Sequence, residues 1–172
     1  MSHRSSATRR GFSLIELVIV VVIIGIIAAI AIPRLSRGAS GAADSALAGN
    51  LSVLRNAVDL YATEHGGTFP AINVDSTSGV NTIDQLLKYT DATGGVSATK
   101  DTTHIFGPYL RKMPVLPVGA FKNNAAVVDN SSGSISAGSS AGGWLYNPTS
   151  GDIKANVADS EKDSSGKAYS SY

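Results

Sequence analysis

The sequence predicts an α+β fold, in which one long N-terminal helix packs against a small antiparallel sheet from the last third of the chain. Three observations lead to this prediction. A continuous apolar run comes first, an amphipathic stretch ending at two glycines comes next, and short strand-like segments separated by turn residues come last. The chain is accordingly divided into a short basic segment (1–11), an apolar helix long enough to span a membrane (12–33), an amphipathic helix (34–67) and a globular head with a polar tail (68–172).

The apolar run has the composition and length of a membrane-spanning helix. From Leu17 to Ile32 it contains only Val, Ile, Leu, Ala and Gly. Counted from Phe12, such a helix is about 31 Å long, close to the hydrocarbon thickness of a bilayer, about 30 Å. Its β-branched residues favour a strand in water, but a lone strand in lipid leaves its backbone unpaired. We therefore expect a helix, with a kink or a local break at Pro33.

One acidic residue, Glu16, interrupts this run four positions after Phe12. An acid within a membrane costs about 2.5–3.5 kcal/mol on insertion scales, and such residues are usually functional. The alternative is a carboxylate that lies at the membrane interface and extends into water.

The residues around Glu16 resemble the class III signal of type IV pilins and pseudopilins. A short basic leader ends in Gly11, and Phe-Ser-Leu-Ile-Glu and the apolar run follow. The resemblance implies that a membrane peptidase cuts after Gly11 and that Phe12 becomes the N-methylated first residue. It also implies that Glu16 acts in assembly. Gly25 and Pro33 match the glycine and proline of the family, and we expect helix to be lost around them on assembly.

Charge gives the orientation of the segment and argues against nucleic acid as a partner. The 172-residue chain has a net charge of +1, and removing the leader, with Arg4, Arg9 and Arg10, makes it −2. No basic patch remains that would bind nucleic acid. More arginines precede the apolar run than follow it, so the N-terminus is expected in the cytoplasm and the head outside it. The chain has no cysteine, hence no disulfide.

The second half of the long helix is predicted from a stripe of five apolar residues, Leu47, Leu51, Leu54, Val58 and Tyr61. They are spaced 4, 3, 4 and 3 positions apart, which places them on one face of a helix. We expect this face to pack against a sheet. His65 and the glycine pair that follows it provide the stop signal. The end of this helix, with Tyr61, Gly66, Phe69 and Pro70, is similar to the boundary between helix and head in pilins and pseudopilins.

Within the head, a short helix is predicted over 83–89, and 104–119 should form an irregular edge or loop because of its prolines. This prolyl segment resembles the one leading into the sheet of the type II secretion major pseudopilin. We expect a strand at 121–128, a mobile hairpin excursion at 129–143 and a strand, turn and strand over 143–156. Trp144 should pack on the long helix, and 158–172 should be frayed.

No catalytic constellation is found, so the chain is not expected to be an enzyme. The histidines are isolated and lack metal-ligand spacing. No cofactor is expected. Calcium is a weak possibility suggested by the pseudopilin G family, with Asp129, Asp152 and Asp159 as the candidate ligands. These residues are widely spaced, and ordinary acidic surface is the favoured explanation.

The resemblance implies a structural subunit of a pilus-like filament, first of all the major pseudopilin of a type II secretion system, which drives protein export across the outer membrane. Its partners would be copies of itself, minor pseudopilins, the prepilin peptidase, an inner-membrane assembly platform with an ATPase, and membrane lipid. The subunit would cross the bacterial inner membrane once, with a periplasmic head, before it enters an extracytoplasmic filament.

Two alternatives remain open. The first is a type IV pilin used for adhesion, motility or DNA uptake. The second is a membrane-anchored or secreted binding protein, for which Ala29-Ile30-Ala31 could be an ordinary secretory cleavage site that leaves Ile32 first.

Overall fold

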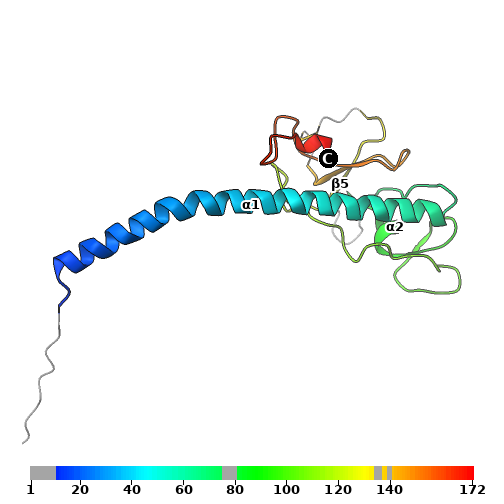
Figure 1. Cartoon of the computed structure of the whole chain (residues 1–172). Coiled ribbons are helices and arrows are strands. Elements are labelled where there is room, and N and C mark those ends of the chain that lie inside the picture. Colours follow the sequence, from blue (N-terminus) through cyan, green and yellow to red (C-terminus); the bar gives the residue numbers. More distant parts are fainter. Residues whose placement is uncertain (1–10, 75–80, 134–136, 139–140) are drawn as a thin grey trace, which may run out of the picture. The chain divides into compact units, whose positions relative to one another are not determined.

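The computed structural model describes residues 11–74, 81–133, 137–138 and 141–172 (Figure 1). The leader arginines lie outside this part of the chain. The chain divides into two compact units, Met1–Ala39 and Ser40–Tyr172. Each unit is described by itself.

One helix, α1 (Leu14–Glu64), begins in the first unit and ends in the second. It continues through Pro33, so the local break considered at this residue does not form. Its C-terminus is closed as the sequence predicts. The N–H of Gly67 donates to the Ala62 carbonyl over 2.7 Å, and Gly66 and Gly67 both have positive φ. This is a Schellman-type ending, which favours glycine after the last helical turn.

The predicted apolar stripe of α1 is buried, as expected for a core-facing side. Its five side chains are at most 1% exposed: Leu47, Leu51, Leu54, Val58 and Tyr61. They share one hydrophobic cluster with residues of the sheet and of the prolyl segment. Trp144 is fully buried in the same cluster, and its indole N–H donates to the carbonyl of Pro114 over 2.8 Å. The head is therefore built around this half of α1.

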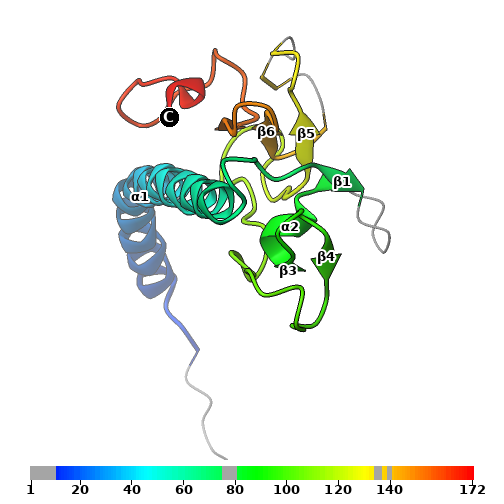
Figure 2. The same cartoon turned by 90° about the vertical axis from the view of Figure 1, so that its right-hand side faces the viewer.

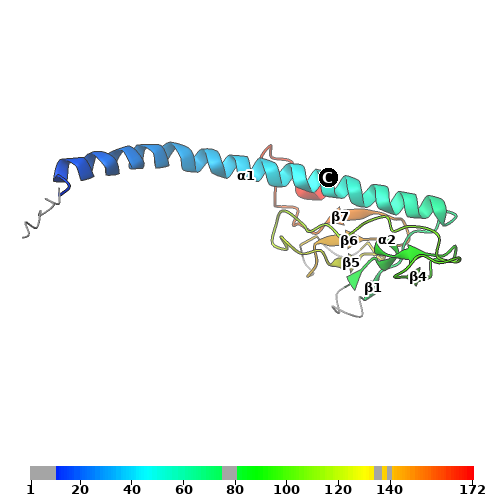
Figure 3. The same cartoon turned by 90° about the horizontal axis from the view of Figure 1, so that it is seen from below.

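The sheet beside this half of α1 has three strands in the order β5 (Val127–Asp129), β6 (Trp144–Tyr146) and β7 (Ile153–Ala155) (Figure 3). The predicted strand, turn and strand correspond to β6 and β7, which pair antiparallel with Trp144 opposite Ala155. In contrast, β5 pairs parallel with β6. Parallel neighbours need a crossover connection of about a dozen residues or more. Hence the connection from β5 to β6 is a crossover, and the prediction of a hairpin excursion at 129–143 is wrong; residues 134–136 and 139–140 of this range lie outside the described part of the chain.

The remaining elements are short (Figure 2). Two antiparallel pairs are formed by β1 (Asn73–Val74) with β2 (Asn81–Thr82) and by β3 (Tyr89–Thr90) with β4 (Val96–Ser97). Between them, α2 is only Asp84–Leu87. It is shorter than the predicted helix over 83–89 because Tyr89 and Thr90 are recruited into a strand. The prolyl segment 104–119 is irregular, as expected, with one isolated bridge from Phe106 to Thr90.

The C-terminal segment is ordered, so the prediction of a frayed tail is wrong. It ends in the short helix η1 (Tyr169–Ser171). Asp44 on α1 is only 8% exposed, and its carboxylate accepts from the Tyr169 hydroxyl over 2.6 Å and from the Ser164 N–H over 3.0 Å. The Tyr169 hydrogen bond is the main reason that the pKa of Asp44 lies below its usual value. A buried carboxylate needs such donors, so Asp44 ties the tail to the helix.

Candidate functional site: the N-terminal processing and assembly segment

The first unit exposes a long apolar helical surface. Every large hydrophobic side chain from Phe12 to Leu35 is at least 46% exposed, and Phe12 reaches 88%. An 18-residue window of this helix has a mean hydropathy of 3.2, none of it is buried, and the helix is long enough to cross a membrane. Contiguous apolar surface of this extent is not stable in water. It requires either lipid or the apolar surface of another protein.

The predicted cleavage position lies just before this helix. Residues 11–13 are not helical, and α1 begins at Leu14. Among the described residues, and apart from its chain neighbours, none places a heavy atom within 4 Å of where a Cβ of Gly11 would be. Gly11 and Phe12 are both exposed. The bond between them is therefore exposed and outside the helix, which suits a peptidase.

Glu16 closes the first turn of α1. Its carboxylate Oε2 accepts the backbone N–H of Ser13 over 2.8 Å. Ser13 precedes the first helical residue and Glu16 is the third, so the pair occupies the N-cap and N3 positions of a capping box. The negative charge also lies at the positive end of the helix dipole. In the single chain Glu16 is therefore not a bare charge within an apolar run.

Sequence reasoning identified Glu16 but not this capping role, and it assigned no role to Ser13. The signal was present, because Ser-x-x-Glu before an apolar run is the usual capping-box pattern. The same residues also belong to the processing signal, and the sequence prediction used the pattern for that signal alone.

Gly25 and Pro33 both lie within the continuous helix. A Cβ at Gly25 would meet nothing within 4 Å, so packing within the chain gives no reason for glycine there. Pro33 has no N–H for the carbonyl one turn earlier. Both residues have poor helix propensity, by about 1 and 3 kcal/mol relative to alanine. The loss of helix between them on assembly stays a prediction.

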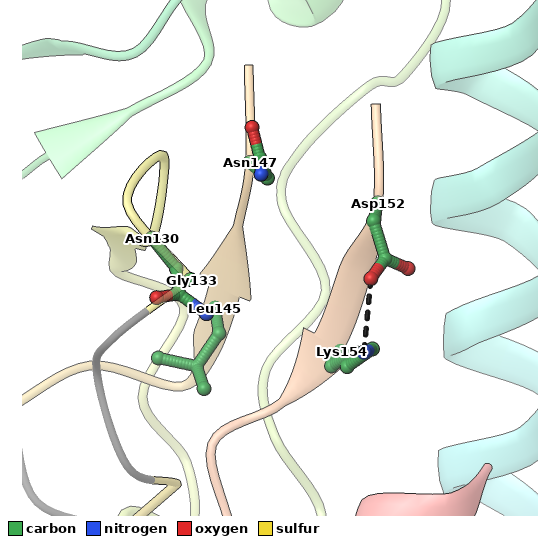
Figure 4. Close-up of a pocket in the computed structure, with 6 residues that line it drawn as sticks. All are labelled: Asn130, Gly133, Leu145, Asn147, Asp152 and Lys154. Carbon is green, nitrogen blue, oxygen red and sulfur yellow. Dashed lines mark ion pairs between the residues drawn. The ribbon is translucent and has the colours of Figure 1, made fainter. Parts of the chain in front are cut away.

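The three aspartates considered for calcium do not form a ligand set in the described residues. Asp129 accepts the N–H of Ser131, and Asp152 forms an ion pair with Lys154 at 3.0 Å. This pair borders a polar pocket of about 140 Å³ (Figure 4), lined by Asn130, Gly133, Leu145, Asn147, Asp152 and Lys154. The one carboxylate of this pocket is already paired with a lysine. The arrangement does not fit a calcium site, which needs several convergent oxygens.

Comparison with protein families matches residues 6–32 to the prokaryotic N-terminal methylation motif. No curated protein and no solved structure matches the chain. The matched range contains Gly11, Phe12, Ser13 and Glu16, and it ends one residue before Pro33. Residues 6–32 therefore carry the class III signal of type IV pilin-like proteins, which fits a chain that is anchored in a membrane through its apolar helix.

Proposed function

We propose that this chain is a structural subunit of a pilus-like filament and that its system is type II secretion, where it would be the major pseudopilin. The observation that carries the proposal is the first turn of α1. The methylation motif spans this turn, the Gly11–Phe12 bond just before it is exposed, and a single carboxylate lies at the start of a helical segment whose large apolar side chains up to Leu35 are exposed. The role is one of assembly and not of catalysis.

The proposed assembly step follows from this geometry. Cleavage after Gly11 leaves a positively charged methylated amine on Phe12, four residues before Glu16. In a filament the apolar helices contact one another in place of lipid. The amine of one subunit then meets the Glu16 carboxylate of its neighbour. Opposite charges attract strongly where water is excluded, and each offsets part of the other's burial cost. The pair would fix the register between subunits.

The capping box adds a condition to this step. In the single chain, the Ser13 N–H and the helix dipole already stabilise Glu16. The carboxylate has a second oxygen and further lone pairs free for a neighbour's amine. We propose that Glu16 keeps its cap and receives the amine on its other oxygen. The cap would then hold the carboxylate in the orientation that the neighbour needs.

The remaining partners and the location belong to the same proposal. The leader arginines favour a cytoplasmic N-terminus, so the head would lie in the periplasm until an ATP-driven platform in the inner membrane extracts the subunit. The prepilin peptidase would cut the leader, and minor pseudopilins would join the filament.

The absence of cysteine and the prolyl segment 104–119 favour the pseudopilin over a type IV pilin. Deleting the chain in its host and measuring export distinguishes the two. A type II role predicts that exported proteins accumulate in the periplasm and that surface pili are unaffected. Normal export together with lost pili, motility or DNA uptake would instead indicate the pilin.

A further inference from the structure

The second unit exposes few large aliphatic side chains, and several of them gather beside α1. Among its described residues, those that are at least 40% exposed are Val53, Leu60, Val96, Ile105 and Val115. Val53 and Leu60 belong to α1, and Val115 belongs to the prolyl segment 104–119. These three residues, together with Arg111 and Lys112, are called the basic flank.

Two hydrogen bonds place part of the prolyl segment along α1. The side-chain amide of Asn50 donates to the Val115 carbonyl over 3.0 Å, and the Tyr109 hydroxyl donates to the Glu64 carboxylate. From Asn50 to Glu64 the helix rises about 21 Å. An extended chain from Tyr109 to Val115 spans about 20 Å. Residues 109–115 therefore run nearly straight along one side of α1, in the opposite direction.

The exposed aliphatic residues of α1 lie on this same side. Val53 follows Asn50 by three positions, and Leu60 precedes Glu64 by four. Residues three or four positions apart share a side of a helix. Val53 and Leu60 therefore border the extended segment and form one surface with it.

The two basic residues of the flank have no partner within the part of the chain that the structure describes. Arg111 and Lys112 are both exposed, and the side chain of neither forms an ion pair or a hydrogen bond there. Exposed aliphatic side chains gathered beside free charges are typical of a surface that binds another protein. The charge of this surface favours an acidic partner.

The flank is also hollowed, and its main chain is open. A hollow of about 340 Å³ is lined by Asn50 and by residues 112–115. Among the described residues, none forms a hydrogen bond with the main-chain N–H and C=O groups of residues 111–113. An extended segment with free main-chain groups can pair with an added strand.

We propose that the basic flank is a docking site for an extended segment of another protein, in which acidic and aliphatic residues alternate. Its carboxylates would pair with Arg111 and Lys112, and one aliphatic side chain would enter the hollow. Its main chain would add as a strand to residues 111–113. Alternation suits this site because successive side chains of a strand point to opposite faces. This proposal does not depend on the filament role.

A second copy of the chain offers a weaker match. Asp59 on α1 is exposed, and its carboxylate has no partner among the described residues. However, its exposed neighbours one turn away, Asn56 and Thr63, are polar. A second copy would therefore bring this charge without a large aliphatic side chain one turn away on the same side. Self-association through the flank is the competing outcome of the test.

The probe is a blocked, fluorescein-labelled heptapeptide of alternating valine and glutamate. Fluorescence anisotropy follows its titration with the full chain in neutral detergent micelles, and empty micelles control for adsorption. We expect saturable binding that weakens as salt is added, and none for a peptide with lysine in place of glutamate. Arg111→Gln combined with Lys112→Gln should weaken binding about tenfold, through the loss of two exposed ion pairs. Lys100→Gln combined with Lys122→Gln removes the same charge from other exposed positions and should bind as the wild type does.

Strand addition is tested with a peptide methylated on alternate main-chain nitrogens, which should bind at least tenfold more weakly. Hydrogen exchange at the amides of residues 111–113 should slow with the unmodified peptide only. The proposal is overturned by an absence of saturable binding at millimolar concentrations, by equal losses in the two double variants, or by full binding of the methylated peptide. It is also overturned if the chain self-associates in sedimentation without peptide and the variant at 111 and 112 does not, because the flank is then an interface between copies.

Discussion

Replacing Glu16 separates its two roles, because Gln and Ala remove different parts of the interaction. Glu16→Gln keeps an oxygen that can accept the Ser13 N–H, as Gln does in other capping boxes, but it removes the charge. Glu16→Ala removes both. Loss of the Glu16 side chain that accepts the Ser13 N–H lowers the stability of the helix N-terminus by about 0.5–1 kcal/mol. In contrast, a neighbour's amine left without its partner in a buried interface costs about 3–5 kcal/mol. We therefore expect both variants to insert and to be cleaved after Gly11, and both to fail in assembly by a factor of 100 or more (about 1.4 kcal/mol for each tenfold).

The assay needs each variant as the only copy of this subunit in the cell. Leader removal is followed by the change in mass of the chain, and assembly by electron microscopy and quantification of sedimented filaments. If Glu16→Gln assembles as well as the wild type and Glu16→Ala does not, the cap matters and the charge does not. If both assemble as the wild type does, Glu16 is not involved and the proposed register between subunits is wrong.

Three further predictions concern the helix and the head. Leu51→Ala should lower the free energy of unfolding by about 2–5 kcal/mol in a denaturant titration, because Leu51 is 1% exposed within the core; a loss below 1 kcal/mol would contradict the core assignment. Tyr169→Phe should lower the free energy of unfolding by about 1.5 kcal/mol. It should also make this free energy depend less on pH in the acid range, because the lowered pKa of Asp44 contributes stability above pH 4 that is lost as the pH falls through its folded-state value. An unchanged acid dependence would show that the tail contact is not formed in solution. A filament map should show interrupted helical density between Gly25 and Pro33, and continuous density from Phe12 through Pro33 would refute that prediction.

The parts of the fold that sequence predicts are those governed by local periodicity. The 4-3-4-3 spacing from Leu47 to Tyr61 gives the buried face of α1, because side chains three and four positions apart share a side of a helix. Gly66 and Gly67 predict where α1 ends, because glycine is favoured after the last helical turn. The β6 and β7 pair follows from a turn-rich segment between an apolar triplet and a short segment that alternates apolar and polar residues.

The parts that sequence did not predict depend on distant partners. The parallel pairing of β5 with β6 is set by tertiary packing, and a Gly/Ser-rich connection fits a hairpin loop and a crossover equally well. The tail looked frayed because it is polar, but Asp44, more than a hundred residues away, supplies the acceptor that orders it. In the N-terminal segment, the motif predicts the roles of Gly11, Phe12 and Glu16, and these roles stay predictions. The capping bond from Ser13 was overlooked because the same letters also formed a processing signal.

The mature N-terminus is the measurement that tests the central claim most directly. Intact and peptide mass spectrometry of the chain from its host would identify the first residue and any modification on it. The account predicts that the chain begins at Phe12 and carries an N-methyl group, consistent with the methylation motif over residues 6–32. A chain that begins at Ile32, or that retains Met1 and the leader, would contradict it.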